Sequence, residues 1–566
     1  MEPPARGAAS LLGRPVVRRD IEALVQEAAR RAMDAGALPH VSLPESTVER
    51  PQRPEHGDYA SNIALRLARA AGTTPLALAE AIAARIPESD IVARVEVAPP
   101  GFINFRLSPA WLARQVEEVL RQGDAFARVD VGRGQRVQVE YVSANPTGPL
   151  TVAAGRGLAI GDTLANLLEA TGHQVEREYY INDAGTQTET FAATLFARYR
   201  QLHGQAVEVP PGAYTGEYVI DLAREAKERF GDRFLAYAEG PCPPELHDFG
   251  MQRMLERIRE DLALMGAHYD SWFSERSLYP EPYQTVMRLL EERGYVARKE
   301  GAVWFTSSAL GEDKDNVLVR SNGRPTYFAS DIAYHYHKFL VRGYDRVVDI
   351  WGADHQGHVP RMKAAVAALG IDPERLVIII HQLVTLKRGG EEVRVSKRAG
   401  EIVTLREVVE EVGADACRFF FLSRAPNSHM DFDLELAARQ SAENPVYYVQ
   451  YAHARMAGIL AHARERVPDY ADGDVSLLRE DVELALVRQL LRLPELVETA
   501  ARKLEPHLLP YYAIDLATAF HDFYERCRVV SEDVPLSKAR LKLVAATKGV
   551  LARTLGLMGM SAPDRM

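Results

Sequence analysis

The order of apolar and polar positions predicts a layered α/β core in the middle of the chain. A strand-like run at 136–142, a helix-forming stretch that ends before Gly172 and a second β-like run at 175–181 follow one another. This order predicts a right-handed βαβ unit with parallel strands. Because the pattern returns at 346–351, 360–369 and 376–380, we expect a doubly wound, Rossmann-like sheet.

Residues 186 to about 315 are mostly helical in pattern, with Pro/Gly breaks and one short strand at 302–305. We interpret this segment as an insertion between the two halves of the sheet. Past residue 400 the pattern is helical to the end, with no further strand predicted. The last part of the chain is therefore expected to be an all-α bundle.

The first part of the chain has short helical and strand-like runs, with strands expected at 95–97 and 102–105. This pattern predicts a small α+β domain, which on sequence alone is as consistent with a structural cap or a dimerisation module as with a binding domain. The complete division is an N-terminal domain at 1–125, the Rossmann-like domain at 126–400, a linking helical segment at 401–440 and a helical domain at 441–566.

Composition fits a multidomain globular protein, since 47% of the 566 residues are hydrophobic and 26% are charged. No stretch resembles a signal peptide or a membrane span, so we expect a cytoplasmic protein without a membrane partner. Three widely separated cysteines fit a reducing compartment and argue against a cysteine zinc site.

The net charge of −10 excludes few functions, because nucleic-acid binding needs only local positive charge. Residues 536–553 carry five basic residues and no acidic one, although such a run is more often a solvated face.

The most informative segment is 140–161, where a strand, a Pro/Gly turn and a glycine-rich helix start form the layout of a nucleotide site. The sequence Ser-Ala-Asn-Pro-Thr-Gly-Pro-Leu at 143–150 resembles the beginning of the catalytic domain of bacterial arginyl-tRNA synthetases, which are class I enzymes. The phrases HGDYASNIALRLAR (56–69) and VEVAPPGFINFRL (95–107) resemble the N-terminal domain of that family, which touches the outer corner of tRNA. The phrases at 444–455 and 560–566 resemble its anticodon-binding domain.

This resemblance implies ATP-dependent ligation of L-arginine to tRNA(Arg) through an arginyl-adenylate, with release of AMP and diphosphate. It implies ATP as a substrate, Mg²⁺ with it and no resident metal site. We expect a monomer.

Recognition of arginine requires carboxylates, because a carboxylate meets the planar fork of guanidinium donors with two charge-assisted hydrogen bonds. Tyr327 and Asp331 are four residues apart, so a helix would place both on one face, although a surface helix is the ordinary alternative. The resemblance implies that Asp331 meets the guanidinium. It implies that the arginine site is lined by Glu140, Ser143, Asn145, Tyr327 and Asp331, with a further wall from 352–358 that we assign to Gln356. His355 and His358 have a metal-ligand spacing but no third ligand nearby, so no metal is expected there.

At the nucleotide end, the family usually has the signature HIGH or HVGH, and this chain has Thr151-Val152-Ala153-Ala154 followed by Gly155. Both imidazoles are missing, and loss of one transition-state donor typically costs about 3 to 4 kcal/mol. The Thr151 hydroxyl, the helix amides and the glycines remain. Residues 391–400 match the mobile loop written KMSKS, with Lys397 and Ser396 at its second lysine and serine and Arg394 in place of the first lysine. Our hypothesis is an active enzyme in which Lys397, Thr151 and Ser396 act on ATP; the alternative is an inactive relative that binds tRNA or arginine.

Aromatic residues next to arginine suit unstacked RNA bases, and the resemblance assigns tRNA contacts to Tyr447, Tyr451, Arg455 and the terminal Met566. For any single ring, a place in the bundle core is the more common reason. A dinucleotide-dependent oxidoreductase is disfavoured because the glycines at 155, 157 and 161 are wrongly spaced, and a P-loop ATPase because GxxxxGK[ST] is absent.

Overall fold

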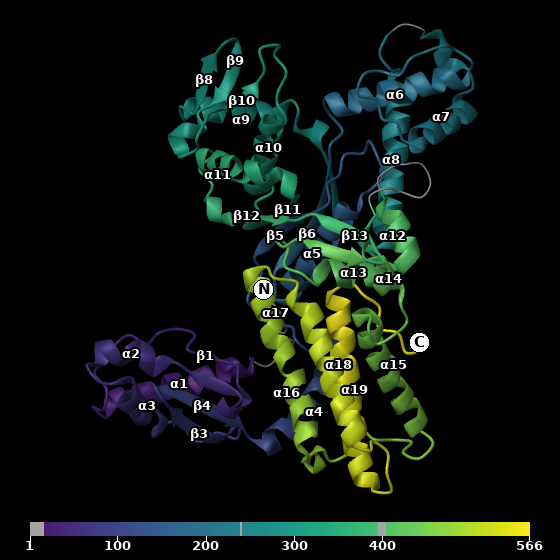
Figure 1. The fold of residues 1–566 in the computed structure, drawn as a ribbon. Helices are drawn as coiled ribbons and strands as arrows, with labels where there is room; N and C mark the ends of the chain where they lie inside the picture. The colour runs from purple at the N-terminus through teal and green to yellow at the C-terminus, as the bar shows by residue number, and fades with distance from the viewer. Residues whose placement is uncertain (1–15, 238–239, 394–402) are drawn as a thin grey trace, which may run out of the picture.

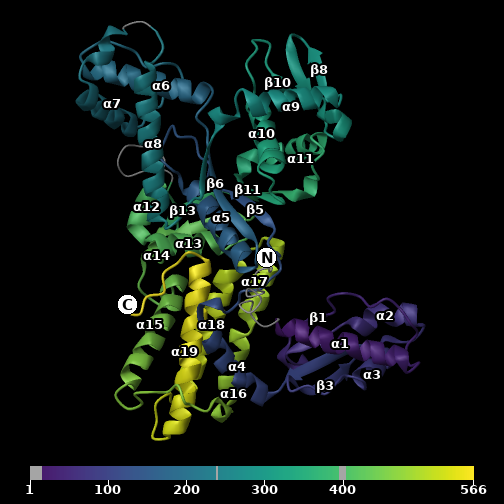
Figure 2. The same cartoon turned by 180° about the vertical axis from the view of Figure 1, so that it is seen from behind.

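The computed structural model describes residues 16–237, 240–393 and 403–566. Figures 1 and 2 show a central sheet with two lobes on one side, a long helix bundle on the other and the N-terminal domain beside the bundle. No helix in these residues is long and apolar enough to cross a membrane.

The central sheet has five strands in the order β12-β11-β5-β6-β7, all of them parallel. The strands are β5 (Arg136–Glu140), β6 (Gln174–Ile181), β7 (Ser271–Ser274), β11 (Arg346–Gly352) and β12 (Leu376–His381). Val348 of β11 packs in one hydrophobic cluster with α5 (Val152–Ala170), and Val347 packs in another with α11 (Val359–Ala368). Helices therefore cover both faces and the doubly wound fold is confirmed. The chain leaves β5 and β11 toward opposite faces, and ligands bind at such a switch point.

The prediction of one continuous insertion is corrected by β7, which lies inside the segment 186–315 and pairs with β6 in the sheet. The four residues Ser-Trp-Phe-Ser are too few for a strand period to stand out in a helical segment. Before β7, helices α6 (Thr186–Leu202), α7 (Glu217–Phe230) and α8 (Pro244–Leu264) share a core of their own. After it, a second lobe contains α9 (Glu281–Glu292), the antiparallel sheet β10-β9-β8 and α10 (Tyr327–Tyr336). Its strands are β8 (Val296–Lys299), β9 (Ala302–Phe305) and β10 (Asn316–Val319).

A small sheet follows the central one and contains a strand that the sequence pattern did not predict. Strand β13 (Val384–Arg388) pairs with β14 (Glu391–Glu392) and, in parallel, with β15 (Met430–Asp433). The expectation of no strand after residue 400 was wrong, because a four-residue strand between helices gives no readable alternation. Helices α12 (Leu405–Val412), α13 (Ala414–Leu422) and α14 (Leu434–Ala438) surround it.

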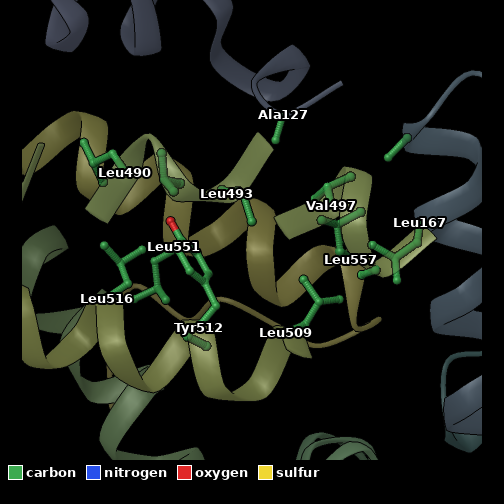
Figure 3. Close-up of a cluster of buried hydrophobic side chains, with 14 of the residues drawn as sticks. Ala127, Leu167, Leu490, Leu493, Val497, Leu509, Tyr512, Leu516, Leu551 and Leu557 are labelled. Atoms are coloured by element: carbon green, nitrogen blue, oxygen red, sulfur yellow. The ribbon is translucent and has the colours of Figure 1, made fainter. Parts of the chain in front are cut away.

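The C-terminal bundle is all-α, as predicted, among the described residues from 441 onward. It consists of α15 (Pro445–Ala463), α16 (Asp481–Leu490), α17 (Arg492–Lys503), α18 (Leu508–Arg526) and α19 (Val534–Leu557). Figure 3 shows its core, where Leu516 and Leu551 lie beside Tyr512. The Tyr512 hydroxyl donates to the Gln489 carbonyl at 3.0 Å, which satisfies its one buried polar atom.

The basic run on α19 does not form a free cationic face. Lys538, Arg540, Lys542 and Lys548 form ion pairs with Asp472, Glu483, Glu117 and Asp564, respectively. For these four basic residues, the ion pairs favour a solvated face over a phosphate-binding surface.

The N-terminal part is α+β, as predicted, with an antiparallel sheet in the order β1-β2-β4-β3. The strands are β1 (Val48–Glu49), β2 (Tyr59–Ser61), β3 (Val92–Ala98) and β4 (Phe102–Leu107), and the helices are α1 (Val17–Asp34), α2 (Ile63–Ala71) and α3 (Pro75–Ala83). Helix α4 (Pro109–Gln122) lies in the range 1–125 but packs on α16 and α19 instead. It therefore belongs structurally to the bundle.

Arg418 of α13 joins three separate elements in the interior. Its buried guanidinium contacts Asp162 of α5 at 2.8 Å and donates to the carbonyls of Met265 after α8 and Met558 after α19. A side chain that is fully buried and ion-paired in this way fixes the Rossmann-like domain against the bundle.

The Arg418→Met variant should therefore lower the free energy of unfolding by about 3 to 5 kcal/mol, because it leaves a buried carboxylate without its nearest cation. Urea unfolding measures this loss. Arg439→Met is the control, since Arg439 forms exposed ion pairs with Glu435 and Glu443, and exposed pairs of this kind contribute little to stability. Equal midpoints for the two variants would contradict the role of Arg418.

Candidate active site

Three carboxylates lie side by side across the central sheet. Asp349 of β11 is in register with Glu140 of β5, and Glu140 is in register with Glu178 of β6. Side chains at equivalent positions of neighbouring parallel strands point to the same face. Asp349 and Glu178 are 0% exposed, whereas Glu140 is 8% exposed and retains some contact with solvent.

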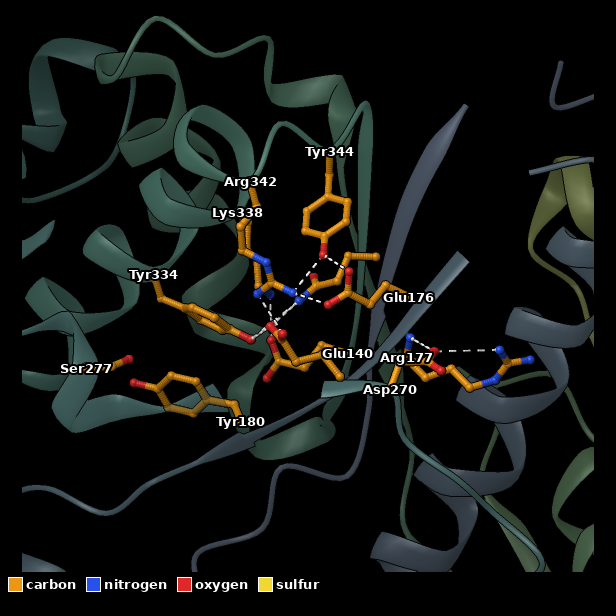
Figure 4. A network of polar contacts seen from close by, with 12 residues as sticks. Glu140, Glu176, Arg177, Tyr180, Asp270, Ser277, Tyr334, Lys338, Arg342 and Tyr344 are labelled. Carbon is orange, nitrogen blue, oxygen red and sulfur yellow. Dashed lines mark hydrogen bonds and ion pairs between the residues drawn. The ribbon is translucent and has the colours of Figure 1, made fainter. Parts of the chain in front are cut away.

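Two cations from one helix end compensate this row. Helix α10 continues into the π-helical turn η6 (His337–Val341), in which Lys338 Nζ lies 2.6 Å from Glu140 Oε2 and 2.9 Å from Asp349 Oδ1. Four residues later, Arg342 Nη1 lies 2.6 Å from Glu178 Oε2. Figure 4 shows both side chains reaching the carboxylates from the same side.

Burial and these cations act on the ionisation of the row in opposite directions. Burial raises the pKa of Glu140 although Lys338 opposes the rise. Burial also acts to raise the pKa of Asp349, but Lys338 and His335 together lower it to about 2. Burial lowers the pKa of Lys338, but Asp349 and Glu140 raise it further than burial lowers it. The ammonium and the Asp349 carboxylate are therefore charged at neutral pH.

The turn after β5 has an unusual backbone. Val142 and Ser143 have φ angles of 70° and 41°, in the left-handed region that a β-branched residue rarely adopts. This conformation directs Ser143 Oγ to donate to Glu140 Oε1 at 2.9 Å and to accept from the Tyr180 amide at 3.1 Å. Asn145 Nδ2 donates to Gln187 Oε1, at the start of α6.

The helix predicted to contain Tyr327 and Asp331 is confirmed as α10, whose N-cap Thr326 accepts from the Ala329 amide. Tyr327 is 45% exposed, and a Cβ at Gly185 would lie 3.2 Å from its hydroxyl, so this glycine leaves room for the ring. One turn later, burial raises the pKa of the Asp331 carboxyl to about 6, and the charge of Glu140 adds to the rise. No hydrogen bond or ion pair to its carboxylate is seen within the described ranges.

Two residues that the sequence reasoning missed have buried polar atoms beside Asp331. The Tyr180 hydroxyl and Glu275 Oε2 are buried without a hydrogen-bond partner in the part of the chain that the structure describes. Burial raises the pKa of Glu275 to about 7, and Asp331 and Asp183 contribute to the rise. Burial also raises the pKa of Tyr180, and the charges of Glu275 and Asp331 raise it further. We call Asp331, Glu275 and Tyr180 the acceptor cluster. Neither of its carboxylates forms an ion pair within the part of the chain that the structure describes, and the cluster suits a planar cationic donor group.

Gln356 is the sixth predicted arginine-site residue. It is exposed on η7 (Ala353–His358), and no hydrogen bond joins it to the other five predicted arginine-site residues within the described ranges. The rings of His355 and His358 lie 5.5 Å apart, and no cluster of three or more His, Cys, Asp or Glu with a metal-binding arrangement occurs among the described residues.

The start of α5 forms the other end of the site. Thr151 is its exposed N-cap, and its hydroxyl makes no capping hydrogen bond. Val152 is buried, while Ala153 and Ala154 are half-buried. A Cβ at Gly155 would lie 2.5 Å from the Leu405 side chain, so a larger residue there would require Leu405 to move.

The chain that returns after the predicted mobile loop meets this helix start. Thr151 forms an antiparallel bridge with Thr404, and the Leu405 amide donates to the Leu150 carbonyl at 2.8 Å. Ser396 and Lys397, together with Arg394, lie outside the described residues. The described residue Thr404 is seven positions after Lys397 in the sequence.

The predicted RNA-contacting residues of α15 form a partly exposed aromatic surface, in which Tyr451 is exposed and Tyr447 and Arg455 are half-buried. The rings of Tyr447 and Tyr451 are stacked at 6.0 Å with 9° between their planes. The Arg455 guanidinium lies 5.7 Å from the Tyr451 ring and 4.4 Å from that of Tyr524 on α18. Met566 is 55% exposed at the chain end. Such surfaces suit stacking of unpaired bases.

Three family models match consecutive parts of the chain. "Arginyl tRNA synthetase N terminal domain" matches residues 19–107, "tRNA synthetases class I (R), catalytic domain" matches 115–424 and "DALR anticodon binding domain" matches 449–566. The catalytic match begins within α4, which agrees with the packing of that helix away from the N-terminal sheet.

Similar proteins cover nearly the whole chain. A protein of Dehalococcoides mccartyi named Arginine--tRNA ligase is 54% identical over 96% of this chain and 98% of its own length. One of Syntrophotalea carbinolica with the same name is 48% identical over 97% of this chain and all of its own. The solved structure of Thermus thermophilus arginyl-tRNA synthetase is similar in fold, with a TM-score of 0.74, 24% identity and coverage of 97% of this chain and all of that one. The chain therefore belongs to the arginyl-tRNA synthetase family.

Proposed function

We propose that this protein ligates L-arginine to tRNA(Arg) with ATP, through an arginyl-adenylate and with release of AMP and diphosphate. One observation carries the proposal. Among the described residues, two buried or half-buried carboxylates and a tyrosine hydroxyl lie together beside the carboxyl ends of β5 and β6, and neither carboxylate forms an ion pair with a cation. A guanidinium supplies the missing positive charge and several donors in one plane.

In this proposal, Asp331 and Glu275 bind the guanidinium, while Tyr180 and Tyr327 lie along its sides. Glu140, Ser143 and Asn145 hold the ammonium end near the carboxyl end of β5. Gln356 contributes from η7. The hydrogen bond from Ser143 to Glu140 and the left-handed turn support this division, because they fix an acceptor group where β5 ends.

Activation joins a carboxylate oxygen of arginine to the α-phosphorus of ATP, and the bond to the bridging oxygen breaks as diphosphate leaves. A hydroxyl of the terminal tRNA ribose then attacks the arginyl carbonyl carbon, and AMP leaves. Negative charge grows on phosphate oxygens in the first step and must be met by donors already in place. The amides of the first turn of α5, the Thr151 hydroxyl and Lys397 supply them, with Val152, Ala153, Ala154 and Gly155 beside the nucleotide and Ser396 next to the lysine.

Mg²⁺ enters with ATP in this proposal. Since no cluster of three or more metal-binding side chains exists within the described ranges, phosphate oxygens and water would supply most of its ligands. This ion would spread the charge of the leaving diphosphate.

The inactive alternative has no support from the structure or from the relatives, whose names are those of ligases. We assign the outer corner of tRNA to the N-terminal domain, and the anticodon to Tyr447, Tyr451, Arg455 and Met566. The protein acts as a monomer in the cytoplasm in this proposal.

The direct test is charging of tRNA(Arg) with labelled arginine by the purified protein, together with arginine-dependent exchange of diphosphate into ATP, with and without tRNA. We expect arginyl-tRNA to form only when arginine, ATP and tRNA are all present. Failure to form product at micromolar enzyme, in a preparation that still binds arginine, would reject the activity in favour of the inactive alternative.

Asp331→Asn should raise the KM for arginine by roughly 10- to 150-fold, because a charge-assisted hydrogen bond contributes about 1.5 to 3 kcal/mol. In the unaltered protein, the same KM should rise as the pH falls through about 6, where the raised pKa lets the Asp331 carboxyl take up a proton. The variant should lose that dependence. Steady-state charging between pH 5.5 and 8 measures both effects, with Asp431→Asn as the control, because Asp431 is an exposed residue of β15.

Lys397→Ala should slow diphosphate exchange by about 100- to 1000-fold, the usual effect of removing one transition-state donor. Its affinity for tRNA should stay within threefold of the unaltered protein. Lys387→Ala is the matched control, because Lys387 is a nearby lysine that pairs with Asp431 instead. Exchange at an unchanged rate in Lys397→Ala would remove this lysine from the mechanism.

A further inference from the structure

Lys338 is a fully buried cation that the proposed chemistry does not use. Its side chain is 0% exposed, and its ammonium lies between two carboxylates and 4.1 Å from the centre of the Tyr334 ring. Isolated buried ammonium groups are costly, so lysine is rarely found in this position without a function or strong partners. The π-helical turn that carries it is a feature often found at functional sites.

We infer that Lys338 is a positioning residue for arginine, which acts by holding the Glu140 carboxylate in place and charged. The inference rests on the proposed function, because it assigns to Glu140 a part in binding the amino acid. Lys338 itself need not touch the substrate. It has no exposed surface, and its two ion-pair partners are both members of the carboxylate row.

Geometry limits how Glu140 can be oriented. One of its oxygens accepts from Lys338 at 2.6 Å and the other accepts from Ser143 at 2.9 Å. The carboxyl plane is thus fixed from two sides, while each oxygen can still accept a further hydrogen bond and the residue keeps 8% exposure. Without Lys338 only the Ser143 contact would remain.

The same lysine connects the two ends of the arginine site. Asp349 takes one hydrogen bond from Lys338 and lies 2.9 Å from His335 Nε2 through its other oxygen. The second ring nitrogen of His335 lies 2.8 Å from the backbone carbonyl of Asp331. A continuous series of contacts therefore runs from Glu140 on β5 to the backbone of Asp331 on α10.

Charge gives a second reason for this role. The charged and titratable groups that face Glu140 are Lys338 from η6, Asp349 from β11, Glu178 and Tyr180 from β6, and Asp331 and Tyr334 from α10. Lys338 is the cation among these groups, and the other charged ones are carboxylates. Its removal would leave burial and like charge to favour the protonated carboxyl, which cannot balance the ammonium group of arginine.

The test uses the full-length protein with Lys338→Met and Asp349→Asn combined, so that one buried charge of each sign is removed together. Asp349→Asn alone sets the baseline, since it leaves the contact between Lys338 and Glu140 in place. Lys363→Met is a structural control: Lys363 Nζ of α11 donates to the carbonyls of Pro373 and Leu376, away from the site. Arginine binding is measured by calorimetry, the KM values by charging and the folding by thermal unfolding.

We expect the double variant to bind arginine 10- to 100-fold more weakly than Asp349→Asn, with KM values for ATP and tRNA within threefold. The pH below which its arginine affinity falls should be higher than in Asp349→Asn, because Glu140 then loses its proton less readily. Lys363→Met should lower the unfolding temperature without changing arginine affinity or its pH profile. That contrast separates positioning from a purely structural effect.

Arginine affinity and a pH profile equal to those of Asp349→Asn in a folded double variant would overturn the inference. So would failure of the double variant to fold when Asp349→Asn folds, because Lys338 would then act on stability. The proposed function fails in a different way: the unaltered protein would bind arginine in the calorimeter but form no arginyl-tRNA.

Discussion

The carboxylate row on β11, β5 and β6 sets the main constraint on this structure. Three acidic side chains in register on one face cannot all be ionised and buried unless cations lie within a few ångströms. Lys338 and Arg342 meet this need from a single helix end. The position of α10 and of the lobe that carries it is therefore tied to the sheet by charge as well as by apolar packing.

That constraint separates the charges of the site into two regions. Acidic and phenolic groups gather where α10 meets β5 and β6, and the amides that begin α5 lie beyond the turn that follows β5. A cationic amino acid suits the first region and a polyanionic nucleotide suits the second. A parallel sheet whose connections leave toward opposite faces brings both regions to one edge, which explains why this fold can hold the two substrates next to each other.

The sequence was sufficient for four of the five strands of the central sheet, for the helix that carries Asp331 and for the extent of the C-terminal bundle, because each has a readable pattern of apolar and polar positions. It was insufficient for β7 and β15, which have four residues each and depend on pairing with distant strands. Glu275 follows β7 directly, so it was missed together with that strand. A signal for Lys338 did exist: Tyr327, Asp331, Tyr334 and Lys338 recur at helical spacing, which places them on one face of the helix.

Without the two imidazoles at the start of α5, the backbone amides of its first turn become the main donors that this helix can offer to phosphate oxygens. The amides of the first turn of α5 keep their direction whatever side chains they carry, and a helix N-terminus attracts anions through those amides and its dipole. Gly155 still permits close packing against Leu405, and the bridge from Thr151 to Thr404 ties this turn to the chain that follows the lysine loop. Substitution by Thr151 and Ala154 therefore removes two side-chain donors but preserves the geometry that aligns the rest. In the proposed function, a site altered in this way would depend more heavily on Lys397 than one with both imidazoles, since fewer donors would share the charge that develops on the phosphate.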